Sequence, residues 1–224
     1  MSYSIIIPIY NEKLVLPELI KKLYNLNKGF QIIIIDDGSN DGTSELLEIH
    51  SDRFNIIQNK KNIGKGASIR KGINIATSEN IILIDGDLEI DIGIIPSLIK
   101  SYEDLEKGVL LGVRWKKNHK LPNEINRIGN FIINSIFNFI YKTKFSDVLC
   151  CIRIINSNEL RSFNLKSDGF GIEVETMAKI VSNKIDFSEK VVNYKRRGIK
   201  EGKKLKMTDS FEIISKIFRN RYFK

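Results

Sequence analysis

The chain has 224 residues, 42% of them hydrophobic, and a formal net charge of +9 at pH 7, so it can form one large domain with a substantial core. It is not a small disulfide-stapled scaffold, because its two cysteines, Cys150 and Cys151, are adjacent, and adjacent cysteines rarely satisfy disulfide geometry. The positive charge favours an anionic partner, but not nucleic acid, since the basic residues concentrate late in the chain without interleaved stacking aromatics.

The first half of the chain alternates short Ile-rich strands with amphipathic helices, which is typical of a mostly parallel sheet covered by helices on both faces. Strands are predicted at residues 3–8, 31–36, 54–58, 80–85 and 108–113. Helices are predicted at residues 14–26, after the turn at 39–43, at 67–76 and at 92–105. The fold class is therefore α/β.

The second half is less regular. It predicts a helix with a broad apolar face at residues 126–142, a helix at 172–182, a strand at 185–194 and a helix at 209–218. No repeat or linker divides the chain, so we expect a single domain over residues 1–224. Its first half (1–115) would bind the main ligand, and its second half (116–224) would carry a basic loop and a C-terminal amphipathic helix.

The predicted strand at 80–85 runs directly into an acidic segment, Asp85-Gly86-Asp87-Leu88-Glu89. In an extended chain alternate side chains share one face, so the carboxylates of Asp85, Asp87 and Glu89 can project to the same side. Such hard oxygen ligands suit Mg²⁺ or Mn²⁺, which keep positions open for water and for phosphate groups. The alternative is a chance acidic triplet in a surface turn.

The turn at residues 36–43 follows a predicted strand and precedes a helix. Asp36 can accept hydrogen bonds there from a nucleobase or a ribose, and Gly38 and Gly42 permit the tight backbone path. A plain helix-capping loop, with Asp41 or Thr43 as the cap, is the alternative, and both functions are compatible.

Residues 62–66 (Asn-Ile-Gly-Lys-Gly) place Lys65 between glycines at the start of a helix, a pattern that suggests backbone amides and an ammonium group facing phosphate. This is not a Walker loop, because the G-x-x-x-x-G-K-[ST] spacing is missing. No G-x-G-x-x-G follows the first strand either, which argues against a dinucleotide-binding Rossmann site.

These motifs occur in a characteristic order. Residues 4–12, the turn at 36–43, residues 62–66 with Arg70, and residues 85–89 resemble the ordered motifs of inverting glycosyltransferase family two. The chain is most similar to its dolichol-phosphate mannosyltransferase-like and polyprenyl-phosphate glycosyltransferase-like branch. The likeness continues downstream through residues 112–114, Asp147, Cys151, Arg153, 171–175 and 197–205. It implies a GT-A type nucleotide-diphospho-sugar transferase fold.

The resemblance also implies roles for individual residues, with Asp87 central to catalysis. The base and ribose would contact Pro8, Tyr10, Glu12, and Asp36 or Asp37. The metal and the diphosphate would be held by Asp85, Asp87 and Glu89. The phosphates of donor or acceptor would be approached by Arg114, Arg127, Arg197 and Lys203. Two positions depart from the family pattern, because Gly86 replaces the usual alanine and Glu89 stands where some relatives carry glutamine.

The implied reaction displaces a nucleotide diphosphate from the anomeric carbon by attack from the opposite face, with cations stabilising the leaving group. A phosphate acceptor is already ionised and needs no general base, whereas a hydroxyl acceptor benefits from one. Asp147, Glu173 or Glu175 could serve as that base. Their alternative role is a buried salt bridge or a charge at a helix N-terminus.

The segment at residues 196–205 packs cations around two glycines, which is the composition of a mobile phosphate-gripping loop. A solvated run of charge is the alternative.

Several features indicate a cytoplasmic protein. Cys150 and Cys151 are interpreted as free thiols of a reducing compartment. The apolar run at residues 4–10 is interrupted by Pro8 and has no basic region before it, unlike a secretory signal. No segment reaches the about 18 to 20 unbroken apolar residues of a membrane span. The helices at 126–142 and 209–218 fit either peripheral contact with the cytosolic membrane face or ordinary core packing.

The first functional hypothesis is a metal-dependent inverting enzyme that moves a hexose from a UDP- or GDP-linked sugar onto polyprenyl phosphate. The alternative is a family two glycosyltransferase with a hydroxyl acceptor in cell-wall or polysaccharide biosynthesis.

Overall fold

The computed structural model describes residues 1–26, 29–105, 107–115, 125–198 and 207–222. A seven-stranded sheet in the order β3-β2-β1-β4-β6-β5-β7 forms its centre. The strands are β1 (Tyr3–Ile9), β2 (Gln31–Asp36), β3 (Asn55–Gln58), β4 (Asn80–Leu83), β5 (Val109–Val113), β6 (Arg153–Asn156) and β7 (Phe187–Val191). All neighbouring strands run parallel except β6, which is antiparallel to both β4 and β5.

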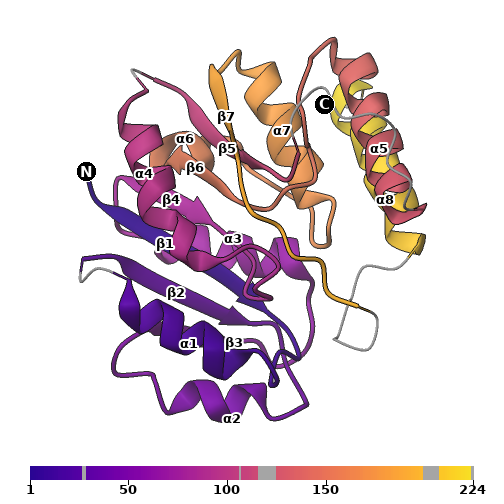
Figure 1. Cartoon of the computed structure of the whole chain (residues 1–224). Helices are drawn as coiled ribbons and strands as arrows, with labels where there is room; N and C mark the ends of the chain where they lie inside the picture. Colours follow the sequence, from indigo (N-terminus) through magenta and orange to yellow (C-terminus); the bar gives the residue numbers. More distant parts are fainter. Residues whose placement is uncertain (27–28, 106, 116–124, 199–206, 223–224) are drawn as a thin grey trace.

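Helices pack on both faces of this sheet (Figure 1). They are α1 (Leu16–Asn25), α2 (Thr43–Glu48), α3 (Lys65–Ile75), α4 (Ile95–Glu103), α5 (Ile125–Tyr141), α6 (Ser157–Ser162), α7 (Ile172–Ser182) and α8 (Met207–Tyr222), with a short 3₁₀ turn at Ile92–Ile94 before α4. The predicted mostly parallel α/β architecture is confirmed.

The alternation of side chains along β1 divides the core into two clusters. Ile5 and Ile7 point to the side of the sheet covered by α1 and α4, whereas Ile6 points to the side covered by α3, α5, α7 and α8. All three isoleucines are fully buried. A strand that is apolar on both faces belongs in the middle of a sheet, which is where β1 lies.

The predicted elements differ from the observed ones in a few places. The sequence missed β6 and α6, and it extended the fourth strand to residue 85, whereas β4 ends at Leu83. Strand β6 is only four residues long and begins with Arg153, which interrupts the apolar pattern that marks a buried strand. The sheet takes strands from both predicted halves of the chain; the single-domain division itself stays a prediction.

Candidate active site

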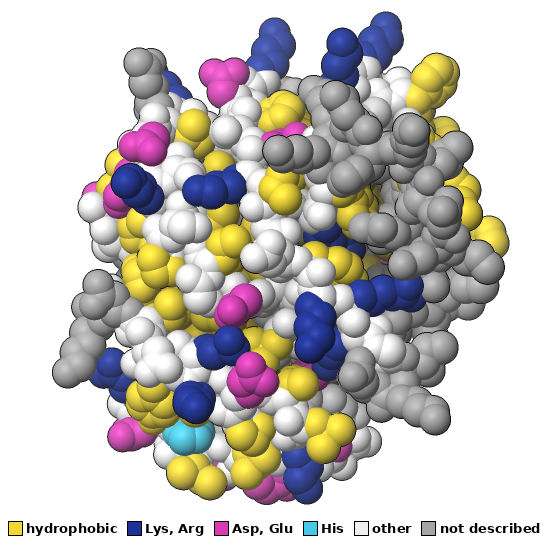
Figure 2. All heavy atoms as spheres, in the orientation of Figure 1, with side chains coloured by type: hydrophobic (Ala, Val, Ile, Leu, Met, Phe, Trp, Pro, Cys, Tyr) yellow, Lys and Arg dark blue, Asp and Glu magenta, His cyan; other side chains and the backbone are white. Residues whose placement is uncertain are grey.

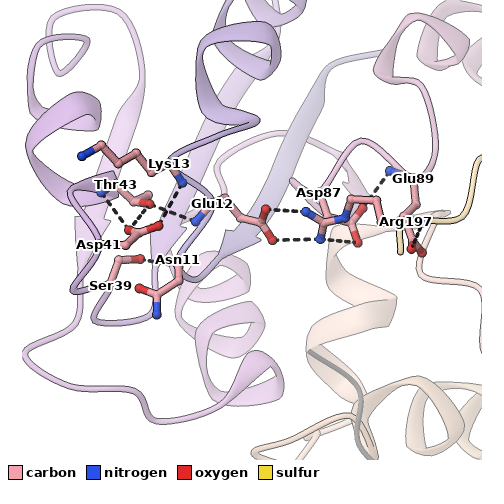
Figure 3. A network of polar contacts seen from close by, with 9 residues as sticks. All are labelled: Asn11, Glu12, Lys13, Ser39, Asp41, Thr43, Asp87, Glu89 and Arg197. Atoms are coloured by element: carbon pink, nitrogen blue, oxygen red, sulfur yellow. Dashed lines mark hydrogen bonds and ion pairs between the residues drawn. The ribbon is translucent and has the colours of Figure 1, made fainter. Parts of the chain in front are cut away.

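The loops after β1 and β2 are tied together at one edge of the sheet (Figure 3). Strands β1 and β2 end in register, with Ile9 opposite Asp36. Beyond them, the amide of Asn11 donates to Ser39 Oγ (2.8 Å), and the amide of Glu12 donates to Thr43 Oγ1 (2.9 Å). Because the two loops fix each other, the side chains that follow β1 are held at a defined place above the sheet.

Asp36 and Asp37 are buried and accept hydrogen bonds from their own surroundings. Asp36 accepts from the amide and the hydroxyl of Ser39 (3.0 and 2.5 Å) and from the hydroxyl of Ser44. The cap of α2 is Gly42, without a side-chain cap bond, so the alternative with Asp41 or Thr43 as the cap is wrong; Asp41 instead accepts from the amide and the hydroxyl of Thr43 (3.0 and 2.6 Å). The predicted contact of Asp36 or Asp37 with base or ribose stays a prediction.

Asp37 organises the glycine-rich segment at residues 62–66. Its carboxylate accepts from the amides of Ile63 (2.9 Å) and Gly64 (2.8 Å) and from the side-chain amide of Asn59 (2.9 Å). Two of the amide groups that the sequence assigned to phosphate, those of Ile63 and Gly64, are therefore bonded within the protein. The predicted phosphate contact of Lys65 stays a prediction.

Lys65 opens α3 and reaches across to the exit of β4. Its ammonium group lies 2.7 Å from a carboxylate oxygen of Asp85 and 2.8 Å from one of Glu173. Burial by itself lowers the pKa of Lys65, but the charges of Asp85 and Glu173 outweigh burial and raise the pKa well above its usual range. Lys65 thus joins the loop after β4 to the first turn of α7.

The acidic segment at residues 85–89 does not continue the strand. It forms a turn in which Leu88 adopts a left-handed conformation (φ 58°). The prediction that Asp85, Asp87 and Glu89 share one face of an extended chain is therefore wrong. The Glu89 carboxylate instead accepts from the backbone amide of Arg197 (2.9 Å).

Asp85 and Asp87 nevertheless form an acidic pair that suits a divalent cation. Burial and the neighbouring charge of Asp85 raise the pKa of Asp87 to about 6. A cation bound between these oxygens would relieve this repulsion. Among the residues that the structure describes, no group of three or more acidic, histidine or cysteine side chains is arranged to hold a metal. Two carboxylates are enough for Mg²⁺ or Mn²⁺ when substrate phosphates complete the shell.

Arg197 connects the loop after β1 with the acidic segment after β4 (Figure 3). Its guanidinium group makes paired contacts with the carboxylate of Glu12 (2.7 and 3.0 Å), and one of the same nitrogens lies 3.4 Å from Asp87. Arg197 thus lies beside the acidic segment and is paired with Glu12; its predicted contact with phosphate stays a prediction.

Asp147, one of the predicted bases, is paired with Arg114, one of the predicted phosphate ligands. Arg114 also lies against the rings of Trp115 and Tyr194. The sequence reasoning gave Tyr194 no role, although it follows β7, and β7 runs parallel to β5 and so ends at the same edge. Burial and the charge of Glu89 raise the pKa of Tyr194 to about 12.

The other predicted bases are also engaged. Glu173 contacts Lys65 and the fully buried Arg153. Glu175 accepts from the amides of Lys166 (2.9 Å) and Ser167 (2.7 Å). Glu173 thus forms the buried salt bridge that the sequence left open, and Glu175, in the first turn of α7, is held by amides of the preceding loop. A role of either residue as the base stays a prediction.

The remaining predicted residues either belong to β1 and the loop after it or lie outside the described residues. Pro8 is in β1 opposite Ile35, and the half-buried Tyr10 follows that strand. Lys203 and the side chain of Arg127 lie outside the described residues. Their predicted phosphate contacts stay predictions.

Comparison with known proteins identifies relatives of this chain. The family model Glycosyl transferase family 2 matches residues 4–163. An uncharacterized protein of Methanocaldococcus jannaschii is 32% identical over 209 residues, which cover 84% of this chain and 90% of that protein. Dodecaprenyl-phosphate galacturonate synthase of Rhizobium johnstonii is 26% identical over 176 residues, which cover 75% of this chain but only 52% of the synthase.

Among solved structures, glucosyl-3-phosphoglycerate synthase from Mycobacterium tuberculosis, in complex with Mn²⁺, UDP and phosphoglyceric acid, superimposes with a TM-score of 0.77. The match covers 100% of this chain and 79% of the synthase at 15% sequence identity. At that identity the likeness shows the fold, and it confirms the predicted GT-A type.

Proposed function

We propose a donor, an acceptor and a mechanism for this chain, which belongs to glycosyl transferase family 2 and is a glycosyltransferase. It transfers a hexose from a UDP- or GDP-linked sugar to polyprenyl phosphate, with inversion at the anomeric carbon. The reaction takes place at the cytosolic face of a membrane. Residues 1–115 supply the donor site, and residues 116–224 supply the acceptor side of a single domain.

The donor binds at the edge formed by the exits of β1, β2 and β4. Its base and ribose lie near Pro8, Tyr10, Asp36 and Asp37, and its diphosphate lies near Asp87 and Arg197. Asp85 and Asp87, with Glu89 close by, would hold Mg²⁺ or Mn²⁺, which when bound supplies positive charge to the leaving diphosphate. The Arg197 guanidinium group adds fixed positive charge at the same place.

The three predicted bases already take part in ion pairs or hydrogen bonds within the protein. This observation is the main support for a phosphate acceptor over a hydroxyl acceptor. Asp147 is bonded to Arg114, Glu173 to Lys65 and Arg153, and Glu175 to backbone amides. A carboxylate held by a cation in a buried site is a poor proton acceptor, because protonation would break the pair. An acceptor that arrives already ionised, such as a phosphate, avoids this difficulty. A relative named for dodecaprenyl phosphate adds support.

Exposed apolar side chains on α5 and α8 also favour a lipid acceptor. Along α8, Phe211, Phe218 and Tyr222 are 76%, 45% and 65% exposed at helical spacing, and on α5 Phe139 is 86% exposed. The two helices pack side by side, and Figure 2 shows hydrophobic side chains at the edge where Figure 1 places them. Aromatic stripes beside exposed cations are typical of helices that lie in a membrane interface. No described helix is both long and apolar enough to span a bilayer.

A product assay tests the proposal. The purified chain is incubated with Mn²⁺, radiolabelled UDP- and GDP-hexoses and polyprenyl phosphate, and the products are partitioned between water and organic solvent. We expect lipid-dependent label in the organic phase that mild acid releases as free sugar. A water-soluble glycoside as the sole product would replace the lipid acceptor with the hydroxyl acceptor. Absence of transfer from every donor to every acceptor would overturn the proposal.

A further inference from the structure

The segment that follows β7 is attached to the acidic segment after β4. Tyr194 forms an antiparallel bridge with Ile90, and the amide of Lys195 donates to the carbonyl of Glu89 (2.8 Å). The amide of Arg197 then donates to the Glu89 side chain (2.9 Å). These contacts fix the backbone of Arg197 beside the proposed diphosphate site but leave the direction of its long side chain undetermined.

Glu12 determines that direction. Both oxygens of its carboxylate accept from the Arg197 fork, at 2.7 and 3.0 Å, and the Glu12 side chain is only 6% exposed. Glu12 is itself fixed, because its amide is bonded to Thr43 and its carbonyl accepts from the amide of Leu16 at the start of α1 (2.9 Å). A paired fork of this kind sets the plane of a guanidinium group as well as its position.

The guanidinium group keeps donor capacity beyond this pair. Arg197 Nε is buried and has no hydrogen-bond partner among the residues that the structure describes. A buried N–H without an acceptor is costly, and such groups often mark the place of a ligand oxygen. One terminal nitrogen also lies 3.4 Å from Asp87, within the site proposed for the leaving diphosphate.

We propose that Glu12 is a positioning residue, whose carboxylate orients the Arg197 guanidinium group toward the diphosphate of the sugar donor. This inference rests on the proposed function, and it replaces the sequence-based assignment of Glu12 to the base or ribose. Both Glu12 oxygens face a cation that would contact the diphosphate, and the two residues are joined across the exits of β1 and β4. Glu12 therefore acts on the donor through Arg197.

Calorimetric titration distinguishes the two roles of Glu12. The full chain is titrated in Mn²⁺ with UDP and GDP and with the matching monophosphates, UMP and GMP. The variants are Glu12→Gln, Arg197→Gln and the double variant. Glu18→Gln, which makes the same chemical change at an exposed carboxylate on α1, is the matched control.

We expect Glu12→Gln to weaken binding of the diphosphate about tenfold and to leave monophosphate binding within about twofold. The double variant should bind no more weakly than Arg197→Gln alone, because both changes disable one unit. Glu12→Asp, which keeps the charge, should recover part of the loss. Glu18→Gln should behave as wild type.

Equal losses of mono- and diphosphate, or losses that add in the double variant, would overturn the positioning role in favour of direct contact with base or ribose. A wild-type chain that binds neither UDP nor GDP would instead overturn the proposed function. If Glu12→Gln fails to fold, Arg197→Lys gives the same test, because it keeps the charge and removes the fork. Undiminished diphosphate binding by Arg197→Lys would then contradict the proposal.

Discussion

Asp147 and Arg114 hold each other in a buried ion pair that joins the end of β5 to the segment before β6. One oxygen of Asp147 lies 2.7 Å from Arg114 Nε, the other lies 2.8 Å from Nη2, and the side chains are only 2% and 11% exposed. The backbone amide of Arg114 donates to the same carboxylate (3.1 Å). The sequence motifs suggested that Asp147 is a base and that Arg114 is a phosphate ligand. Because the two side chains bind each other, we infer that their main contribution is to the stability of the fold.

We therefore predict that Asp147→Asn lowers stability rather than abolishing chemistry. The change leaves the Arg114 charge buried without its partner, which should cost about 3 kcal/mol in the free energy of unfolding. The turnover number of the folded fraction, measured at low temperature, should stay within about tenfold of wild type, since a phosphate acceptor needs no base. Urea unfolding and product assays measure the two effects. Asp52→Asn, at an exposed position, is the control; a stable but inactive Asp147→Asn would identify Asp147 as the base.

Gly86, between Asp85 and Asp87, has no room for a larger side chain, because two isoleucines of β1 pack against it. A Cβ added at Gly86 would lie 2.3 Å from Ile9 Cγ2 and 3.0 Å from Ile7 Cγ2. Gly86→Ala should therefore destabilise the protein by about 1 to 3 kcal/mol. Combination with Ile9→Ala should cost less than the sum of the single changes, because the truncated side chain makes room.

Gly129→Ala is the matched control for this overpacking. Nothing lies within 4 Å of a Cβ added at Gly129, so alanine should stabilise α5 by up to about 1 kcal/mol through its helix propensity. Thermal unfolding of the set measures these effects. If Gly86→Ala were as stable as wild type, Ile9 would not explain why this chain departs from the family's alanine.

The sequence predicted every strand of the sheet except β6, because short unbroken runs of isoleucine mark strands that are buried on both faces. It predicted that ligands would bind where β1, β2 and β4 end, because parallel strands bring their carboxyl ends to one edge. It could not predict the turn at Leu88, since a left-handed leucine has no sequence signature. Nor could it pair Arg197 with Glu12, which is 185 positions away, because such ion pairs depend on tertiary contacts that leave no local pattern.

The turn at residues 85–89 leads to a prediction about metal binding. Asp85→Asn and Asp87→Asn should each abolish the extra thermal stabilisation that Mn²⁺ gives in the presence of UDP or GDP, because each removes a charged ligand. Glu89→Gln should retain most of it, since Glu89 is bonded to the backbone of Arg197. Thermal-shift measurements with and without Mn²⁺ test this. If all three variants lost the Mn²⁺-dependent stabilisation equally, the result would support the metal site of three carboxylates that the sequence suggested.

Membrane contact through α5 and α8 predicts a selective loss of vesicle binding. Phe139→Asp and Phe211→Asp should each weaken binding to vesicles containing anionic lipid about tenfold or more, since each removes an exposed aromatic group and adds a repelled charge. Ile49→Asp, at a similarly exposed apolar position next to α2, should have little effect. Vesicle flotation measures the bound fraction. If all three variants bound vesicles as well as wild type, the exposed aromatic side chains of α5 and α8 would have another function.

The contact between α5 and α8 should weaken at alkaline pH. The buried hydroxyl of Tyr141 donates to the carbonyl of Ile217 (3.1 Å), and burial raises the pKa of Tyr141 to about 12. Because the folded-state pKa lies above the unfolded value of about 10, this contribution to stability is fully present below pH 10 and is lost as the pH rises toward 12.

Tyr141→Phe tests this pH dependence. The variant should be less stable than wild type by about 1 kcal/mol at pH 7, because the Ile217 carbonyl loses its donor. The difference should shrink between pH 10 and pH 12, since only wild type has the ionisable hydroxyl. Urea unfolding across this range measures it, with the exposed Tyr222→Phe as the control. A difference that stays constant to pH 12 would show that Tyr141 stabilises the helix pair through its ring rather than through its hydroxyl.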